Sequence, residues 1–283
     1  MRIPALAVCL ISLYFAFLGC SFEFKATVKS RPSSENQNEG RRLLLPIAAK
    51  NASVFSLGKS VDPKTGKKVE GMAFITREKG FAKSNAKNKT GDKNESQCYA
   101  FLTKDAKWKN AENYIFDPTN NRDLNHATLK KLLKTCTETW NEQVPASIFG
   151  TEVEGMVDNT SFFSLNGKNE VYFGSISDPK NQKAIALTMA WRISEGPAWQ
   201  REILEWDTVF NHTDYDWSTK AIGVAGKIDF LNIAMHEVGH AAGMAHPSDS
   251  CTEETMYGHA TWAETKKRTL NAGDIAGIKE LYK

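Results

Sequence analysis

One stretch of eleven residues, HEVGHAAGMAH from His236 to His246, constrains this chain more than any other and holds three of its six histidines. On an α-helix, His236 and His240 are four residues apart, so their side chains lie only about 40° apart around the axis. Two imidazoles one turn apart can bind a single ion at about 2.0–2.1 Å from each nitrogen. The stretch therefore predicts a helix that carries two ligands of one metal site.

The residues just after this helix provide a third ligand. Gly243 can adopt the left-handed conformation that ends a helix, and Pro247 prevents helical continuation beyond it. The chain can then turn back and bring His246 to the ion. Three neutral nitrogen ligands leave the fourth position of a zinc ion open to water.

Glu237 directly follows the first histidine and lies about 100° further around the helix. At that angle its carboxylate can approach the open position without binding the ion. Zinc lowers the pKa of its water towards about 7, and the carboxylate can accept the water's proton and pass it to a leaving amine. We therefore predict hydrolysis of amide bonds with one catalytic Zn²⁺. The alternative is a closed structural zinc site in which Cys251 takes the fourth position.

The N-terminus has the pattern of a secretory signal peptide. Arg2 is followed by an uncharged apolar run from Ile3 to Gly19. The next residue is Cys20, and FLGC resembles a bacterial lipoprotein signal in which this cysteine is lipidated, although Phe17 stands where leucine is usual. The alternatives are a plain secretory signal or an uncleaved anchor, for which the run is short. We therefore expect an exported protein, either secreted or a cell-surface or outer-membrane lipoprotein.

The composition is that of an ordinary soluble protein, with 41% apolar and 24% charged residues in a chain of 283. The net charge of +3 is too small to indicate binding to nucleic acid or to an anionic membrane surface. Nine lysines fall between Lys59 and Lys93, in a polar region that we interpret as a tether. We expect no nucleic-acid partner and a monomeric protein.

Cysteine usage predicts one disulfide. Besides Cys20 and one cysteine in the signal, the chain has Cys98, Cys136 and Cys251, an odd number for an exported protein. Cys136 falls on the apolar face of a predicted helix over residues 126–142, where a free thiol behaves as a small apolar side chain. This leaves Cys98 and Cys251 as the expected pair.

The chain divides into a signal at 1–19, an N-terminal region at 20–97 and a main domain at 98–283. Within the N-terminal region, residues 43–83 contain a strand-like piece and form either a small β element that packs on the main domain or a pro-segment. Residues 84–97 contain no Leu, Ile, Val, Phe, Tyr or Trp and are predicted to be a linker.

The main domain is predicted to be α+β with a mixed sheet. β-branched and aromatic content predicts its strands at 113–118, 169–176, 183–193 and 202–211. The helix over 126–142 is followed by two more. Asp229 is the predicted N-cap of the histidine-bearing helix, and Asn271 caps a closing helix near the C-terminus.

On these residues the chain resembles the metzincin metallopeptidases, whose signature HExxHxxGxxH is met at His236, Glu237, His240, Gly243 and His246. The family has a methionine turn below the zinc, and CTEETMYGHA supplies Met256 at that place. The segments TLNAGDIAGIKELYK and EWDTVFNHTDYDWST are similar to the matrixin branch. The resemblance covers about residues 98–283 and implies a twisted mixed sheet, an active-site helix, a C-terminal helix and a protein or peptide substrate.

The resemblance carries further implications. The strand around Ala184–Trp191 would be a sheet edge that pairs with an extended peptide, and residues Tyr257–Trp262 would form a wall of the pocket on the leaving-group side. Calcium is common in the family, and Asp214 and Asp216 are its candidates here. Residues 183–211 contain no histidine, so we expect a single zinc.

Thiol latency is not expected, because no cysteine lies between Cys20 and Cys98. The leading hypothesis is therefore an exported zinc endopeptidase of matrixin type. The alternatives are a catalytically inactive, zinc-containing surface binding lipoprotein and a processing peptidase of narrow specificity. The sequence does not indicate the cleavage preference.

Overall fold

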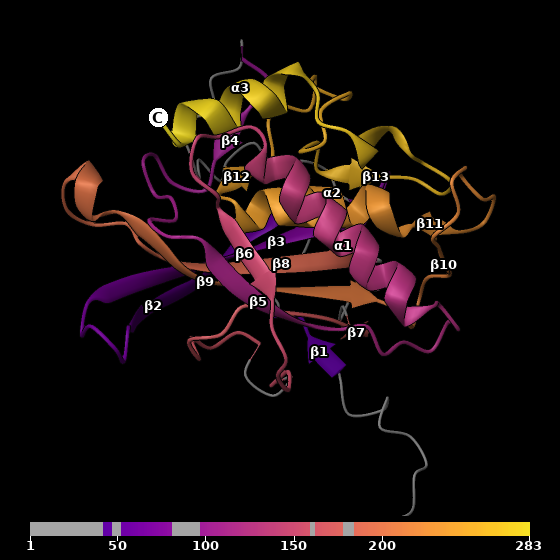
Figure 1. The fold of residues 1–283 in the computed structure, drawn as a ribbon, viewed down its shortest axis with the longest axis horizontal. Helices are drawn as coiled ribbons and strands as arrows, with labels where there is room; N and C mark the ends of the chain where they lie inside the picture. Colours follow the sequence, from indigo (N-terminus) through magenta and orange to yellow (C-terminus); the bar gives the residue numbers. More distant parts are fainter. Residues whose placement is uncertain (1–41, 47–51, 81–96, 159–161, 178–183) are drawn as a thin grey trace, which may run out of the picture. The chain divides into compact units, whose positions relative to one another are not determined.

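A mixed sheet of nine strands dominates the part of the chain that the structure, a computed structural model, describes (Figure 1). The described residues are 42–46, 52–80, 97–158, 162–177 and 184–283. The expected signal at 1–19, Cys20 and nearly all of the predicted linker lie outside them. The strands of the sheet are β1 (Arg42–Leu44), β2 (Val54–Val61), β3 (Lys68–Glu78), β5 (Glu112–Asp117), β6 (Phe149–Glu152), β7 (Glu170–Ser177), β8 (Ala184–Ile193), β9 (Glu202–Asn211) and β13 (His259–Ala260).

The main path of the sheet follows the order β13-β3-β8-β9-β7-β5-β6, with β1 added beside β7 and β2 beside β3. Strands β5, β6, β7 and β9 pair in parallel, whereas β8 runs antiparallel to both of its neighbours. Two further pairs lie outside this sheet: β4 (Ala100–Phe101) with β12 (Met244–Ala245), and β10 (Trp217–Ser218) with β11 (Ile228–Asp229).

Strand β8 is internal, so the expectation of an open edge at Ala184–Trp191 was wrong. On one side β8 pairs with β9, and on the other it pairs with β3 from Glu70 opposite Arg192 to Arg77 opposite Ala184. The physical reason lies in β3, whose side chains are buried on both faces. Its backbone N–H and C=O groups are therefore also removed from water and need strand partners at both edges. Residues 42–78, assigned from the sequence to the N-terminal region, thus contribute three strands to the main sheet.

Three α-helices complete the described fold: α1 (His126–Asn141), α2 (Phe230–Ala241) and α3 (Ala272–Leu281), with 3₁₀ turns η2 (Ala198–Gln200) and η3 (Lys266–Arg268). The side chain of Asp229 caps α2 by accepting from the backbone of Asn232, and Asn271 and Asp274 form a capping box at α3. None of the helices that the structure describes is long and apolar enough to cross a membrane.

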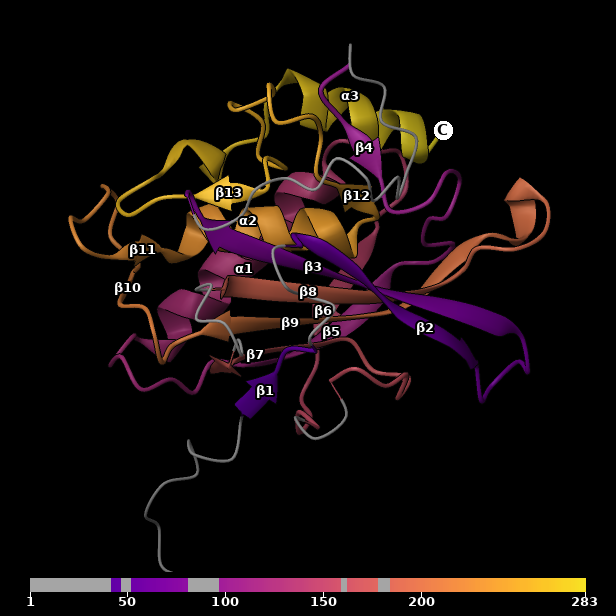
Figure 2. The same ribbon diagram turned by 180° about the vertical axis from the view of Figure 1, so that it is seen from behind.

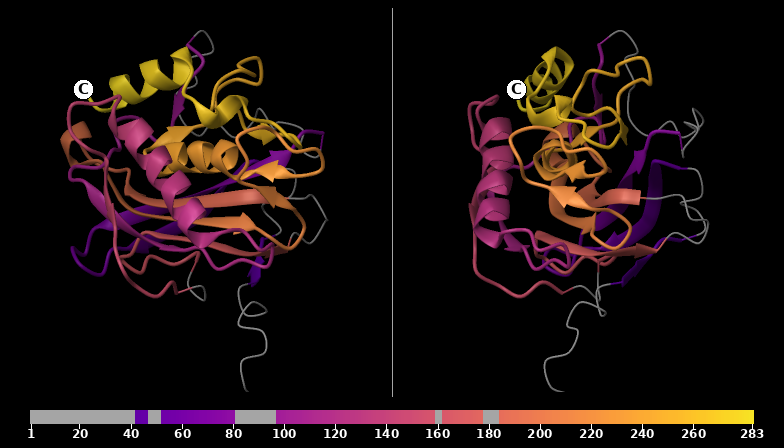
Figure 3. Two further views of the ribbon diagram at one scale, coloured as in Figure 1. Left: turned by 45° about the vertical axis from the view of Figure 1, so that its right-hand side comes forward. Right: turned by 90° about the vertical axis from the view of Figure 1, so that its right-hand side faces the viewer.

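The core has two parts, one on each face of the sheet. Helices α1 and α2 cover one face, as the turned views show, and a large cluster that includes Phe74, Trp140, Trp206 and Met256 fills the space between (Figures 2 and 3). A second cluster that includes Ile75 packs on the opposite face. Alternate residues of β3 thus enter different clusters, which makes this strand part of the core on both sides.

The α+β class with a twisted mixed sheet and a C-terminal helix is confirmed, and α2 is the helix that carries His236 and His240. The helix predicted over 126–142 corresponds to α1, and the four strands predicted in the main domain correspond to β5, β7, β8 and β9 within one residue at each end. These elements carry strong periodicity or β-branched content, so local signals were sufficient to find them.

Candidate metal centre

Three imidazoles converge on one point between α2 and the segment that follows it. The Nε2 atoms of His236, His240 and His246 lie 3.1 Å (236–240), 3.0 Å (240–246) and 3.2 Å (236–246) from one another. A tetrahedral ion at about 2.0–2.1 Å from each nitrogen would separate them by about 3.3 Å. Among the residues that the structure describes, these three histidines form a group of His, Cys, Asp or Glu side chains that could hold a metal ion. Their ligand atoms all lie within 4.8 Å of one another.

Hydrogen bonds on the opposite ring nitrogens orient two of these imidazoles. Nδ1 of His236 lies 2.6 Å from the carbonyl oxygen of Thr255, and Nδ1 of His240 lies 2.9 Å from that of Met244. A carbonyl only accepts, so each Nδ1 carries the proton and each Nε2 presents a lone pair. Two lone pairs that face each other at this distance repel unless a cation lies between them. The donor set therefore fits a zinc ion.

Burial keeps these rings neutral. It lowers the pKa of His240 to about 3 and the pKa of His236 well below its usual value of 6.5. A metal ligand must be unprotonated on the nitrogen that binds, so at neutral pH both rings are ready to bind without losing a proton.

Gly243 makes the turn that brings the third ring into place. Its φ of +102° lies in the left-handed region, and its N–H donates to the carbonyl of His240 at 3.0 Å. The next two residues form β12, which pairs with β4, and His246 follows directly. An added Cβ at Gly243 would meet Ile203 and Leu281 at 3.0 Å, so the position also excludes larger residues by packing.

Glu237 is buried beside the trio and is held by a threonine of the sheet. The hydroxyl of Thr188 on β8 donates to Oε2 of Glu237 at 2.6 Å and lies 2.7 Å from the hydroxyl of Thr208 on β9. Because Thr188 gives its one proton to the carboxylate, Thr208 is the donor in the second contact. Burial raises the pKa of Glu237 to about 7, and the hydroxyls of Thr188 and Thr76 partly offset this rise. A carboxyl with such a pKa can exchange protons near neutral pH.

Met256 packs against α2. It is fully buried, and a Cβ added to Gly239 of α2 would come within 2.2 Å of its sulfur. Asp274 of α3 accepts from the backbone N–H of Met256 at 3.0 Å and of Thr255 at 2.7 Å. The carbonyl oxygen of Thr255 in turn accepts from Nδ1 of His236. Asp274 therefore helps to hold the first imidazole in place through the backbone of Thr255. The sequence pointed to Met256 but not to Asp274.

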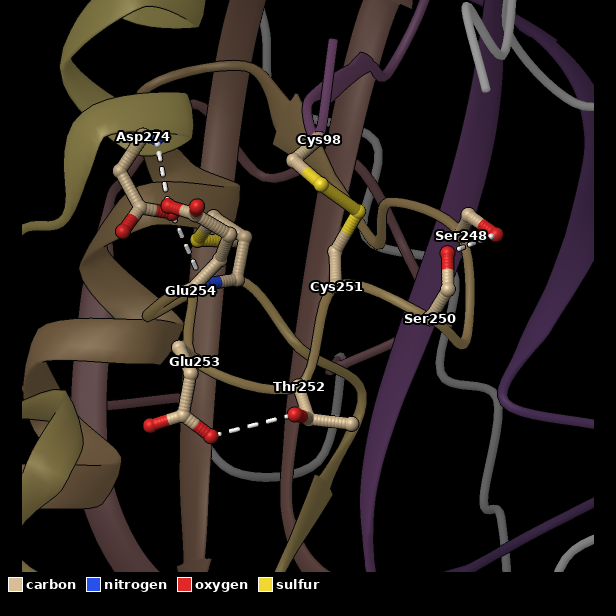
Figure 4. Close-up of a disulfide and its surroundings, with 9 residues drawn as sticks. Cys98, Ser248, Ser250, Cys251, Thr252, Glu253, Glu254 and Asp274 are labelled. Atoms are coloured by element: carbon tan, nitrogen blue, oxygen red, sulfur yellow. Dashed lines mark hydrogen bonds between the residues drawn. A yellow bond between two sulfur atoms is a disulfide. The ribbon is translucent and has the colours of Figure 1, made fainter. Parts of the chain in front are cut away.

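Cys98 and Cys251 form a disulfide with their Cα atoms 5.4 Å apart (Figure 4). The bridge ties the start of the main domain to the segment between His246 and Met256, close to Glu254, which accepts from the backbone of Asp274 at 3.1 Å. A disulfide sulfur does not bind the ion as a thiolate, so this pairing removes the closed site that Cys251 would have made. Cys136 is free and buried.

The two candidate calcium ligands, Asp214 and Asp216, each contact another side chain. Asp214 accepts from the side chain of Asn211 at 2.9 Å, and Asp216 forms an ion pair with Arg122 at 3.1 Å. The described residues do not bring these two carboxylates into a metal-binding cluster.

A side chain that the sequence did not indicate covers the trio. The ring of Phe74, on β3, stacks on His240 with centroids 4.3 Å apart and an angle of 18° between the planes. It meets His246 edge-on with centroids 6.0 Å apart. The ring thus lies against two of the three imidazoles, and the whole trio is buried: His236 and His240 have no exposed surface and His246 has 8%.

A helix with two histidines one turn apart, a glycine turn, a third histidine and a methionine below them define a metzincin-like domain. The family model for matrixins matches residues 107–283, and the chain belongs to this family of zinc-dependent endopeptidases. Its relatives include matrilysin of Felis catus, 28% identical over 161 residues, which make up 57% of this chain and 54% of that protein. Matrilysin of Homo sapiens is 29% identical over 161 residues, with shares of 57% and 53%. The chain thus spans about half the length of the curated relatives it matches.

Proposed function

We propose that this chain is an exported zinc-dependent endopeptidase that hydrolyses peptide bonds in protein or peptide substrates. The observation that carries the proposal is the convergence of three Nε2 atoms within 3.0–3.2 Å of one another, with Glu237 held one residue from the first ligand. His236, His240 and His246 would hold one zinc ion. When bound, zinc supplies a Lewis acid that polarises the carbonyl under attack and acidifies water.

Glu237 is the proposed general base. Its carboxylate accepts a proton from the attacking water and gives it to the leaving amine, a role for which its pKa of about 7 is suited. Thr188 fixes the orientation of this carboxylate, and Asp274 and Met256 support the ligand helix from below. The proposal requires zinc and no calcium.

Export is part of the proposal. It is supported by the signal-like N-terminus ending at Cys20 and by the pairing of Cys98 with Cys251, because disulfides persist in oxidising compartments outside the cytosol. Lipidation of Cys20 would anchor the protein at a membrane surface, and secretion without a lipid is the alternative. Mass spectrometry of the exported protein separates the two.

A zinc-containing binding protein without catalysis is the second candidate function. One observation favours it, the burial of the trio beneath Phe74. The two are separated by assaying a quenched-peptide library with zinc-loaded wild type and with Glu237→Gln, each before and after limited proteolysis. The peptidase proposal expects hydrolysis that Glu237→Gln lowers by about 10²–10⁴-fold. The exposed surface change Glu280→Gln is the control and keeps full activity. Equal rates for wild type and Glu237→Gln, or no hydrolysis in any form, contradict the proposal.

A further inference from the structure

One tryptophan of this chain differs from the others in its exposure to water. Five of the seven tryptophans are buried with at most 5% of their surface exposed, and Trp262 is half-buried. Trp199 is 73% exposed. A tryptophan removes about 150–250 Å² from water when it is buried, so this indole gives up a large apolar area. Single exposed apolar side chains are common, and the surroundings of Trp199 therefore decide whether it has a role.

Trp199 lies in an apolar turn between β8 and β9. Residues 196–199 read GPAW, all four are exposed, and none has a polar side chain other than the indole itself. The guanidinium of Arg201 holds the turn, because it donates to the carbonyl oxygens of Gly196 and Lys104 at 3.2 Å and 3.1 Å. A turn that is already ordered loses little conformational freedom when its apolar side is covered.

A basic turn between β2 and β3 lies at the same end of the sheet. Residues 63–68 read PKTGKK, and all six are exposed; they include three lysines and no acidic residue. The buried carboxylate of Asp62 organises the turn by accepting from the backbone N–H groups of Lys64 and Thr65 at 3.1 Å. Val61, directly before it, is 57% exposed. The small net charge of the chain does not reveal this turn, because it averages over the whole surface.

Direct contacts join the two hairpins that carry these turns. The ammonium of Lys59 on β2 donates to Glu195 at 2.8 Å, and the hydroxyl of Ser194 donates to Glu70 on β3 at 2.6 Å. Lys59 also pairs with Glu70 at 3.4 Å, so both acidic residues beside the turns are neutralised. Both hairpins extend from one end of the sheet, at the left of Figure 1 and at the right of Figure 2.

An apolar turn with a tryptophan beside a lysine-rich turn favours a lipid bilayer as the partner. Tryptophan is enriched at the membrane–water interface, where its ring is buried and its N–H stays near polar groups. Each lysine close to an anionic membrane surface increases affinity by about fivefold. A soluble polyanion would bind the lysines but would leave the residues of the GPAW turn in water. The two turns together therefore fit a bilayer with anionic headgroups better than either a polyanion or an uncharged surface.

We propose that the turns 63–68 and 196–199 form a membrane-binding end of the domain. Trp199 enters the headgroup region, and Lys64, Lys67 and Lys68 contact anionic headgroups. This interaction uses no residue of the metal centre and requires neither zinc nor catalysis. It holds the domain against a membrane surface whether or not a lipid is attached at Cys20.

Fluorescence quenching tests the position of the indole directly. The exported protein is mixed with vesicles of phosphatidylcholine and phosphatidylglycerol whose acyl chains carry bromine, which quenches an indole only at short range. We expect a quenched component in the wild type that is absent from Trp199→Phe, because the other six tryptophans are buried or half-buried in the domain. Equal quenching of the two forms, or none in the wild type, overturns the proposal.

Matched variants test the two parts of the surface, with Cys20→Ser in every form so that no lipid at this position holds the protein. Binding to the anionic vesicles is measured by flotation and by quenching. Lys64→Gln/Lys67→Gln/Lys68→Gln should weaken it about 100-fold, whereas the same change at three exposed lysines of α1, Lys130→Gln/Lys131→Gln/Lys134→Gln, should leave it unchanged. Equal losses in the two triple variants overturn the role of the basic turn.

The apolar turn has its own control. Trp199→Ala should weaken vesicle binding at least about 10-fold, and Ile222→Ala, at a position that is 75% exposed, should not change it. Dextran sulfate and vesicles of phosphatidylcholine alone should both bind more weakly than the anionic vesicles. If dextran sulfate binds through the three lysines but anionic vesicles quench no indole, the turn is a polyanion site and the membrane proposal fails.

Discussion

The hydroxyl of Thr188 lies 2.6 Å from Oε2 of Glu237 and donates a hydrogen bond to it, which joins the central sheet to the active-site helix at the point of proposed catalysis. Thr208, on the neighbouring strand, completes a chain of two hydroxyls that ends on the carboxylate. This arrangement aims the carboxylate without adding charge to the site. Thr188 is therefore a positioning residue.

Replacing Thr188 by valine removes the donor and keeps the shape of the side chain. A hydrogen bond to a charged group contributes about 1.5–3 kcal/mol, so we expect kcat/KM of the zinc-loaded enzyme to fall about 10–100-fold. Thr188→Ser keeps the hydroxyl and should restore most of the rate. Zinc content should stay at the wild-type value in both variants, and full activity of Thr188→Val would show that the contact does not orient the base.

Zinc is expected to stabilise the folded chain. At a free zinc concentration 100 times the dissociation constant, the free energy of unfolding should increase by about 2.7 kcal/mol. His246→Ala should abolish most of this increase because it removes a ligand, and His126→Ala, an exposed change at the start of α1, should keep it. Calorimetry with and without a chelator measures the difference. An equal response of the two variants would contradict the assignment of ligands.

Asp274 is predicted to support the site from a distance. Its carboxylate accepts from the backbone N–H groups of Thr255, Met256 and Asn271 at 2.7–3.0 Å. Asp274→Ala leaves these donors without a partner, so we expect a loss of at least about 1.5–3 kcal/mol in the free energy of unfolding. Zinc affinity should fall about 10-fold, as for other residues that orient ligands. The exposed change Asp249→Asn is the control, and unaltered zinc affinity in Asp274→Ala would refute the link.

The disulfide between Cys98 and Cys251 is expected to stabilise the main domain. It closes a loop with a sequence separation of 153 residues, and removal of a native disulfide typically costs about 2–5 kcal/mol. The double variant Cys98→Ser/Cys251→Ser should therefore unfold at lower denaturant concentration.

Cys136, which is buried, should resist thiol reagents until the protein unfolds. Rapid labelling of Cys136 in the native protein would contradict the packing.

The buried carboxyl of Glu205 is expected to make the free energy of unfolding depend on pH. Burial raises the pKa of Glu205 from 4.5 to about 7, although the backbone N–H groups of Asn166 and Gly167 donate to it. A carboxyl whose pKa is higher in the folded state holds its proton more tightly there, so its contribution to stability is full below about pH 4.5 and is lost as pH rises through about 7. The stability of Glu205→Gln relative to wild type should increase over that interval. A constant difference across it would show that the pKa of Glu205 is not raised.

Much of the site could be predicted because its parts are close in sequence. Two ligands share one helix, and Gly243 and His246 follow within ten residues of the first, so helix geometry and a glycine turn were sufficient. The caps at Asp229 and Asn271 are local signals of the same kind. Contacts between distant segments gave no such signal. The support of Thr255 by Asp274 and the bond from Thr188 to Glu237 depend on how α2, α3 and β8 come together.

The largest difference between the sequence prediction and the observed fold is the position of β3 in the sheet. The sequence placed a strand-like piece at Met72–Thr76 but not its partner, which lies more than 100 residues further along the chain. A one-residue shift in register would turn every side chain of a strand to the other face, and only tertiary packing selects the register. The run MAFI, apolar at successive positions, is typical of a strand buried on both faces and could have indicated an internal position.

X-ray absorption at the zinc edge of the purified, zinc-loaded protein tests the central claim most directly, because it reports the atoms around the ion. We expect one zinc per chain, bound by three imidazole nitrogens and one oxygen at about 2.0–2.1 Å. A sulfur neighbour at about 2.3 Å, or fewer than three imidazoles, would contradict the account.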